Sequence, residues 1–265
     1  MSQRTRWTIW VMTAASLALF GCGRAKISIT MAGSTAFQPF AEKLAEQYMA
    51  TRPDVNVTVQ GGGSAVGVQS ALSGAAQIGM ADLVTLPAEA SSLTATVVAK
   101  DGIVVVVNPA NRVSNLSTEQ VRDIFNAKVM NWKEVGGEDR PITVVSREAG
   151  SGTRTSFEQI VKDIKLDGNA IVQDSNGTIR ETVANDANAV GYLSHGLLNE
   201  KIKAVTLDGR PGTIEEIIKG NYALVRPVYL LTMGAPEGEV ANFINYILST
   251  EGQDTIKTSG LIPAK

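Results

Sequence analysis

The sequence has one cysteine and one histidine in 265 residues, and its formal net charge is only −2. A single cysteine excludes an internal disulfide framework and a cysteine-rich zinc module. A single histidine, His195, argues against histidine metal sites and histidine-dependent catalysis, although carboxylate sites stay open. Nucleic-acid binding calls for a basic excess, whereas 24 basic residues face 26 acidic ones here. We therefore expect no cofactor, no metal ion and no nucleic-acid partner.

Long apolar runs are also missing, except at the start of the chain. There, two arginines within the first six residues precede an apolar run that ends at Phe20. This pattern is typical of a secretory signal peptide. Because the only cysteine lies where bacterial lipoproteins carry their acylated residue, residues 1–21 are predicted to be a signal peptide with a lipobox. Cys22 is then the lipidated residue, although Phe20 is larger than that pattern prefers.

The predicted anchor places the protein outside the cytoplasm, on the membrane. Residues 22–26 are expected to form a short tether, which at about 3.5 Å per extended residue keeps the folded body close to the membrane surface. The alternatives are a plain signal peptide with an incidental cysteine, or an uncleaved membrane anchor.

After residue 26 the pattern alternates between strands and helices. Strands are expected at 27–32, 55–60, 77–81, 102–108, 141–146, 171–174, 189–194 and 225–232, and helices at 37–49, 65–72, 116–127, 152–163, 178–185 and 238–259. A capping box at Ser117 and Gln120 marks the start of one helix. Such alternation indicates an α/β protein with largely parallel sheets. No linker divides the chain, so two lobes would have to be joined by crossover strands, for which 103–107 and 225–231 are the best candidates.

Three junctions between a strand and a helix are rich in glycine and hydroxyl residues: 32–36, 61–64 and 150–153. At a helix start, unpaired N–H groups and the helix dipole favour an anion. One such loop alone is ordinary turn and capping chemistry. Three loops at the carboxyl ends of strands, where ligands of open α/β sheets gather, predict an anion site.

Two charged residues refine that prediction. Arg147 ends a strand just before the third loop, where its guanidinium could grip an oxyanion with two nitrogens. Asp82 ends another strand, and an ionised carboxylate only accepts hydrogen bonds. It would favour an oxyanion that carries a proton, as phosphate does near neutral pH, over sulfate, which has none. The plainer alternatives are an exposed charge at a strand end for Arg147 and a helix cap for Asp82.

Together these segments resemble the phosphate-binding proteins of bacterial phosphate ABC transporters, the PstS family. The most specific stretches are Ala-Gly-Ser-Thr, Gln-Gly-Gly-Gly-Ser, Ile-Gly-Met-Ala-Asp-Leu and Arg-Glu-Ala-Gly-Ser-Gly-Thr-Arg. The resemblance runs from residue 27 to the C-terminus and is closest to the short lipoprotein members. It implies a periplasmic-binding-protein-like fold of type II, with two α/β lobes joined by crossover strands and a ligand cleft between them. Lobe 1 would comprise residues 27–102 and 227–265, and lobe 2 residues 103–226.

The resemblance also implies a function and a site. The protein would capture inorganic phosphate and deliver it, as a monomer, to the membrane permease of the importer. The residues that match the family's phosphate contacts are Thr35, Ala36 through its amide, Ser64, Asp82, Arg147, Ser151, Gly152 and Thr153, with Ser34 as an additional contact. In this scheme Arg147 is the one full positive charge of the site, and protein dipoles replace the rest of the ligand's hydration.

Three other functions stay open. The same fold could bind another oxyanion such as sulfate or molybdate, which Asp82 argues against. A serine-dependent hydrolase would need one of Ser34, Ser64 or Ser151 with His195 as base, but the chain lacks a Gly-x-Ser-x-Gly elbow. A lipoprotein used chiefly in signalling or adhesion is the third. We expect a binding protein rather than an enzyme.

Overall fold

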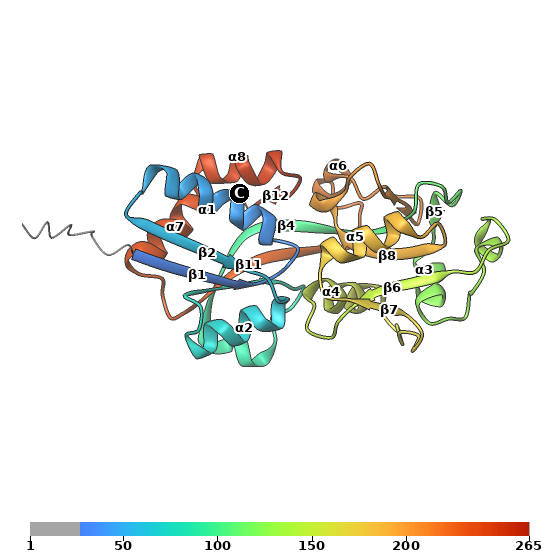
Figure 1. The fold of residues 1–265 in the computed structure, drawn as a ribbon, viewed down its shortest axis with the longest axis horizontal. Helices are drawn as coiled ribbons and strands as arrows, with labels where there is room; N and C mark the ends of the chain where they lie inside the picture. The colour runs from blue at the N-terminus through green and yellow to red at the C-terminus, as the bar shows by residue number, and fades with distance from the viewer. Residues whose placement is uncertain (1–26, 265) are drawn as a thin grey trace, which may run out of the picture.

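A computed structural model describes residues 27–264. In this range the chain forms two lobes, and two long strands run from one lobe into the other (Figure 1). Within the same range, no helix combines the length and the apolar character that a membrane span requires. The predicted signal peptide, the lipidation site Cys22 and the tether lie outside the described residues.

Five strands form the main part of lobe 1, within a ten-stranded sheet that continues into lobe 2. The strand order is β2-β1-β3-β11-β4, and the strands are β2 (Val55–Gln60), β1 (Ile27–Gly33), β3 (Ile78–Asp82), β11 (Val225–Met233) and β4 (Leu93–Val107). The first three strands are parallel to one another. Strand β11 runs antiparallel to β3, and β4 runs antiparallel to β11. One face of the sheet shares a core with α1 (Gln38–Thr51), α7 (Gly238–Ile247) and α8 (Thr250–Thr258). The other face is covered by α2 (Ser64–Ser73) and the short helix η1 (Ala88–Ser92).

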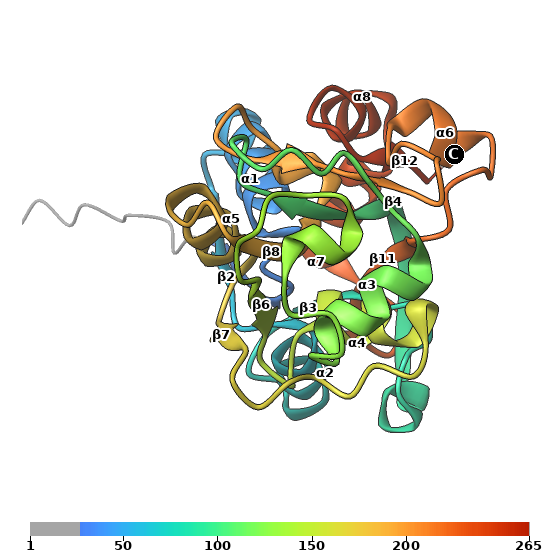
Figure 2. The same cartoon turned by 90° about the vertical axis from the view of Figure 1, so that its right-hand side faces the viewer.

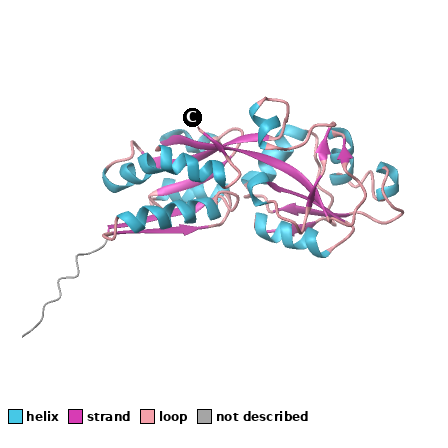
Figure 3. Cartoon of the chain, turned by 90° about the horizontal axis from the view of Figure 1, so that it is seen from above, coloured by secondary structure: helices cyan, strands magenta, loops and turns pink. Residues whose placement is uncertain are grey.

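Lobe 2 continues from the second half of β4. There β4 pairs with β8 (Ala189–Ser194), which is followed by β6 (Thr143–Arg147) and β7 (Ile171–Gln173). Helices lie on both sides of these strands (Figures 2 and 3): α3 (Thr118–Phe125), α4 (Gly152–Val161), α5 (Asn176–Asn185) and α6 (Ile214–Ile218). The remaining short elements are β5 (Asn115–Leu116), β9 (Lys203–Ala204), β10 (Thr206–Leu207), β12 (Ile262–Pro263), η2 (Trp132–Val135) and η3 (His195–Leu197).

The two crossover strands contribute side chains to more than one core, and β4 links the cores of the two lobes. On β11, Leu230 packs into the core under α1, whereas its neighbour Leu231 packs under α2, as alternation along a strand requires. On β4, Val98 lies in the core of lobe 1 and Val106 in the core of lobe 2. Burial of both faces explains the unbroken apolar run at 103–107. The predicted lobe boundaries at 102/103 and 226/227 fall inside these two continuous strands.

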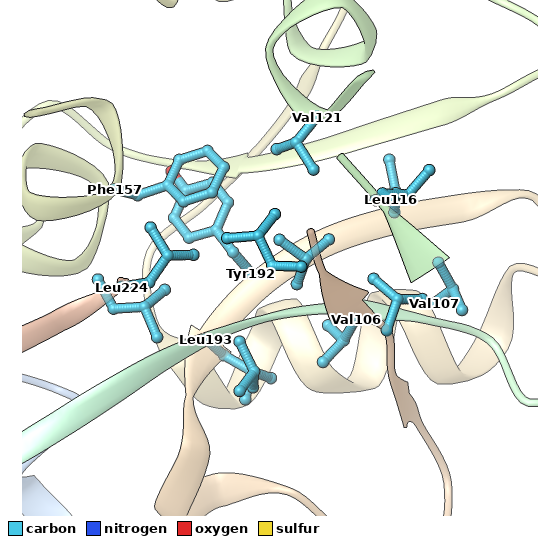
Figure 4. Packing of buried hydrophobic residues seen from close by; sticks show 14 of the residues in the cluster. Val106, Val107, Leu116, Val121, Phe157, Tyr192, Leu193 and Leu224 are labelled. Atoms are coloured by element: carbon cyan, nitrogen blue, oxygen red, sulfur yellow. The ribbon is translucent and has the colours of Figure 1, made fainter. Parts of the chain in front are cut away.

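The core of lobe 2 is organised around aromatic packing (Figure 4). The ring of Tyr192 on β8 stacks on Phe157 of α4, with the ring centroids 4.1 Å apart. Both side chains are fully buried. This contact fixes α4, and with it the helix start that follows the third glycine-serine loop, against the sheet.

The structure confirms the α/β alternation and the capping box at Ser117 and Gln120, and it corrects three details. The sheets are mixed rather than largely parallel, because the crossover strands run antiparallel to their neighbours. The expected strand 102–108 is the second half of a 15-residue strand. The expected helix 238–259 is two helices, because Ser249 caps a new helix by accepting a hydrogen bond from the amide of Gly252.

Candidate oxyanion-binding site

The second and third glycine-serine loops meet between the lobes. Ser64, at the start of α2, donates to Asp82 Oδ1 at 2.7 Å and accepts from the Asp82 amide at 3.1 Å. Across the interface the amide of Ala65 donates to the carbonyl of Gly150 at 3.1 Å. A Cβ on Gly152 would lie 2.1 Å from Ser64 Oγ and 2.7 Å from Asp82 O, so only glycine fits there. The lobes therefore touch at residues that the sequence predicted for one site.

A buried cluster that the sequence did not predict surrounds Asp82. Arg226, at the start of β11, is 1% exposed and places Nη2 2.5 Å from Asp82 Oδ2 and 2.9 Å from Asp101 Oδ2. Its Nη1 also donates to the carbonyl of Asp82 at 3.1 Å. The expectation of one full positive charge, Arg147, is thus wrong, because the site has a second buried guanidinium. The signal that could have revealed it is an arginine inside a strand expected to cross between the lobes.

Five residues close a ring of hydrogen bonds behind this ion cluster. Arg226 Nη2 and Asn176 Nδ2 both donate to Thr153 Oγ1, at 3.0 and 3.3 Å. Ser194 donates its hydroxyl to Asp101 Oδ1 at 2.7 Å and its amide to Asn176 Oδ1 at 3.1 Å. Burial raises the pKa of the Asp101 carboxyl, while Arg226 and the Ser194 hydroxyl act in the opposite direction. The ring joins β4, β8, β11, α4 and α5, so it fixes the site to both crossover strands.

Asn176 also connects the two lobes, and the sequence did not single it out. It is fully buried at the start of α5, and its Nδ2 donates to Thr35 Oγ1 at 3.2 Å as well as to Thr153. Thr35 belongs to the first loop, so this amide brings the first and third loops together. The available signal was the Gln-Asp-Ser-Asn-Gly segment, with its asparagine beside the serine that caps α5.

Arg147 lies at the end of β6, as predicted, and is 1% exposed. Its Nε and Nη2 donate to the two carboxylate oxygens of Glu148 at 2.9 and 2.8 Å, and Nη2 also donates to Asp174 O at 3.1 Å. In residues 27–264 no hydrogen bond joins the Arg147 side chain to another predicted site residue. Arg154 donates to the carbonyl of Arg147 at 2.9 Å and supports the strand end.

The hydroxyls of the first and third loops all act as hydrogen-bond acceptors within the protein. Ser34 Oγ accepts from the amides of Ala36 and Phe37 at 3.2 and 3.0 Å, and Ser151 Oγ accepts from the amide of Arg154 at 3.2 Å. The Thr35 and Thr153 hydroxyls likewise accept from Asn176. Across the described residues none of these four hydroxyls donates a hydrogen bond, so the hydrogen of each has no protein acceptor there. Ser64 differs, because its hydrogen is already given to Asp82.

Two buried polar atoms at the site have no hydrogen-bond partner among the described residues. Within residues 27–264, four buried side-chain polar atoms have no hydrogen-bond partner, and two of these are Asp82 Oδ2 and Arg147 Nη1. Asp82 Oδ2 is in ion-pair contact with Arg226 but without hydrogen-bond geometry. Such orphaned buried groups are rare in native structures and call for an explanation. Here one is an acceptor and the other a donor.

The chemistry of the site follows from these groups. These groups comprise several donors and one carboxylate acceptor, a combination that suits an oxyanion that carries a single proton. The carboxylates of Asp82, Asp101 and Glu148 outnumber the guanidiniums of Arg147 and Arg226 by one. An anion placed here would therefore depend on directed hydrogen bonds and helix-start amides rather than on net positive charge.

The geometry does not assemble a serine nucleophile with a histidine base. His195 is in η3, where its Nδ1 lies 3.2 Å from the carbonyl of Gly260. In the described part of the chain, no hydrogen bond joins His195 to the hydroxyl of Ser34, Ser64 or Ser151. The same residues also hold no group of three or more His, Cys, Asp or Glu side chains that could bind a metal ion.

The fold and the interlobe site define a two-lobed binding protein of the periplasmic type. In agreement, residues 22–251 match the family model described as the PBP superfamily domain. The chain is 34% identical over 245 residues to the phosphate-binding protein PstS of Bacillus subtilis, covering 91% of this chain and 82% of that protein. The chain therefore belongs to the PstS family of phosphate-binding proteins, which confirms the resemblance seen in the sequence.

Solved structures agree with this assignment. A protein from Clostridium perfringens, assigned as a phosphate ABC transporter substrate-binding protein and solved with bound phosphate, aligns with a TM-score of 0.87 and 36% identity. The alignment covers 90% of this chain and all of that one. An ABC-type phosphate transport receptor from Vibrio cholerae aligns with a TM-score of 0.74 and 35% identity, over 88% of this chain and 99% of the other.

Proposed function

We propose that this protein is the extracytoplasmic binding component of a bacterial phosphate ABC importer. It captures inorganic phosphate between its lobes and delivers it to the membrane permease. The observation that carries this proposal is the pairing of unused polar groups in the site. In residues 27–264, Asp82 Oδ2 accepts no hydrogen bond of normal geometry, although Arg226 Nη2 lies 2.5 Å away, and Arg147 Nη1 and the hydroxyls of the first and third loops have no protein acceptor.

Each predicted residue then has a defined role toward phosphate. Arg147 Nη1 and the hydroxyls of Thr35, Ser151 and Thr153 donate to phosphate oxygens, and Asp82 Oδ2 accepts the ligand's proton. The amides of Gly152 and Thr153 add donors at the start of α4, and the hydroxyl of Ser34 is a further donor. The Ala36 amide donates to Ser34 Oγ at 3.2 Å, so it reaches phosphate by exchanging that hydrogen bond for one to the ligand. Ser64 acts by holding the Asp82 carboxylate in place, since its own hydrogen is already donated there.

Selectivity against sulfate and molybdate follows from Asp82. Fully ionised sulfate has no hydrogen to donate, so a sulfate oxygen would face a buried carboxylate oxygen with no hydrogen between them. An unpaired buried contact of this kind costs about 1–3 kcal/mol, more for charged groups. We therefore expect sulfate to bind at least ~100-fold more weakly than phosphate, because both charge repulsion and the lost hydrogen bond contribute.

Isothermal titration of the purified protein, first freed of bound phosphate, tests this function. Phosphate should bind one equivalent per chain at micromolar concentration or tighter, and sulfate should give no measurable heat at the same concentrations. Equal binding of the two anions would contradict the proposal. The hydrolase alternative is checked with a chromogenic ester: turnover that disappears in Ser151→Ala would favour an enzyme.

We further propose that the protein is a lipoprotein anchored through Cys22 and acts as a monomer. Cys22 is the only cysteine of the chain and follows a signal-like segment. The Cys22→Ser variant, expressed in a bacterial host, should move from the membrane fraction to the soluble extracytoplasmic fraction. Ser2→Cys is a matched control, because it alters the leader without moving the predicted acceptor. Retention of Cys22→Ser in the membrane fraction would indicate an uncleaved anchor instead.

A further inference from the structure

Arg226 has no role in the function proposed above, yet it touches two of its residues. Its Nε and Nη2 donate to Asp101 Oδ2 at 3.3 and 2.9 Å, and its Nη1 donates to the carbonyl of Asp82 at 3.1 Å. Nη2 also donates to Thr153 Oγ1 at 3.0 Å. Every nitrogen of this guanidinium thus has a protein acceptor, unlike Arg147, whose Nη1 has none. Arg226 therefore acts on a ligand through its neighbours.

The first neighbour is the Thr153 hydroxyl. Its oxygen accepts from Arg226 Nη2 and from Asn176 Nδ2, at 3.0 and 3.3 Å. A hydroxyl has two lone pairs and one hydrogen. Because both lone pairs are engaged by donors that cannot accept, the hydrogen can only be donated onward. Arg226 thereby makes Thr153 a donor.

The second neighbour is the Asp82 carboxylate. Arg226 Nη2 lies 2.5 Å from Oδ2, and Ser64 donates to Oδ1. The carboxylate is 2% exposed, and a buried charge is tolerated only when it is paired. Arg226 supplies that pair, yet it leaves Oδ2 without a hydrogen bond of normal geometry. The charge is compensated, and Oδ2 can still accept a hydrogen bond because a carboxylate oxygen has two lone pairs.

We propose that Arg226 is a positioning residue that sets the hydrogen-bond polarity of the site, holding Thr153 as a donor and Asp82 as an acceptor. It thereby sets the preference for a monoprotonated oxyanion, phosphate, over sulfate. This inference rests on the proposed phosphate binding. Asp101 keeps the guanidinium in place from β4, so both crossover strands contribute to selectivity although neither supplies a contact to the ligand.

A purely structural ion cluster would also bury Arg226, and removal of one partner from such a cluster destabilises proteins strongly. Selectivity separates the two roles, because loss of stability alone does not change which of two anions binds better. Arg226→Lys keeps the charge but cannot reproduce the fork of donors. Combining it with Asp82→Asn gives a double-mutant cycle, in which the two substitutions fail to add if Arg226 acts through Asp82.

The experiment measures phosphate and sulfate affinities of the full chain by titration, for the unaltered protein, Arg226→Lys, Asp82→Asn and the double variant. We expect Arg226→Lys to lower the phosphate-to-sulfate affinity ratio about tenfold, the scale of one hydrogen bond to a charged group. In the Asp82→Asn background the same substitution should leave the ratio unchanged. Circular dichroism confirms that each variant is folded. Asp101→Asn, which loosens the guanidinium from β4, provides the same cycle if Arg226→Lys does not fold.

The outcomes are distinct. An unchanged ratio in folded Arg226→Lys, or the same loss in both backgrounds, overturns the role of Arg226 while phosphate binding by the unaltered protein stands. An unaltered protein that binds no phosphate overturns the proposed function, and this inference with it.

Discussion

The end of β6 and the start of β11 each bury an arginine near the candidate site, but they neutralise it differently. Arg147 pairs with Glu148, the next residue in the chain, whose side chain is 31% exposed. Arg226 pairs with Asp82 and Asp101, which are 2% and 1% exposed and come from β3 and β4. Within residues 27–264, the first arrangement leaves one nitrogen without a hydrogen-bond partner, whereas the second engages every nitrogen with the protein.

The comparison indicates that the two arginines have different roles, one in binding a ligand and one in connecting strands. An arginine paired locally is held ready to bind, because its partner stays with it whether or not the rest of the fold is in place. The ion pairs of an arginine whose partners are distant in sequence form only with the tertiary structure, and they connect strands that lie far apart along the chain. Four predictions test this difference, beginning with the largest expected effect.

The stability of the fold should distinguish the two arginines most clearly. Arg226→Met leaves two buried carboxylates without their cation, and breaking a buried pair in this way costs about 3–5 kcal/mol of unfolding free energy. Arg147→Met leaves Glu148, which water can reach, so we expect a loss below about 2 kcal/mol. Urea unfolding followed by circular dichroism measures both. Equal losses would show that the two environments do not differ in this respect.

Phosphate affinity should depend more on Arg147 than on Arg226, because only Arg147 is proposed to contact the ligand. Arg147→Ala removes the free guanidinium nitrogen and the charge that neutralises Glu148. We expect affinity to fall about 100-fold or more, because charge-assisted hydrogen bonds contribute about 1.5–3 kcal/mol each. Calorimetric titration measures the loss. Arg140→Ala is the matched control, since Arg140 forms an exposed ion pair with Glu138, and its affinity should be unchanged. Retained affinity in Arg147→Ala would remove Arg147 from the ligand contacts.

Selectivity should depend on the carboxylate that Arg226 holds. Asp82→Asn replaces an acceptor-only group with an amide that can also donate, so sulfate no longer meets a carboxylate. We expect the phosphate-to-sulfate affinity ratio to fall about tenfold or more. Competition titrations with the two anions measure it. Asp101→Asn should change the ratio less, because Asp101 reaches the ligand only through Arg226. An unchanged ratio in Asp82→Asn would mean that the carboxylate is not the filter.

The smallest effect is expected at Asn176. Asn176→Ala removes the amide that orients the Thr35 and Thr153 hydroxyls, while both threonines keep their side chains. Neutral hydrogen bonds contribute about 0.5–1.5 kcal/mol each, so phosphate affinity should fall roughly three- to tenfold. Asn169→Ala, at an exposed asparagine, is the control. If Asn176→Ala binds phosphate as well as the unaltered chain does, the hydroxyls do not need this amide to orient them.

Most elements of the fold could be predicted because their signals are local. The alternation of apolar and polar residues, the capping box at Ser117 and the unbroken run at 103–107 each lie within a few residues of one another. The candidate groups Asp82 and Arg147 could be found for the same reason, since each ends a strand. Asn176 and Arg226 could not, because their partners are distant: Asn176 meets Thr35 from 141 residues away, and Arg226 meets the Asp82 carbonyl from 144.

By itself, the sequence determined which segments form strands and helices, where glycine and hydroxyl residues collect, and which family the chain resembles. Only the tertiary structure decided which hydroxyls keep a hydrogen to donate, which carboxylate oxygen stays free and which arginine is shared between strands. The physical reason is that hydrogen-bond polarity belongs to pairs of groups rather than to single residues. The pairs of Arg226 with Asp82, Asp101 and Thr153 depend on the crossover strands, which bring together positions that lie far apart along the chain.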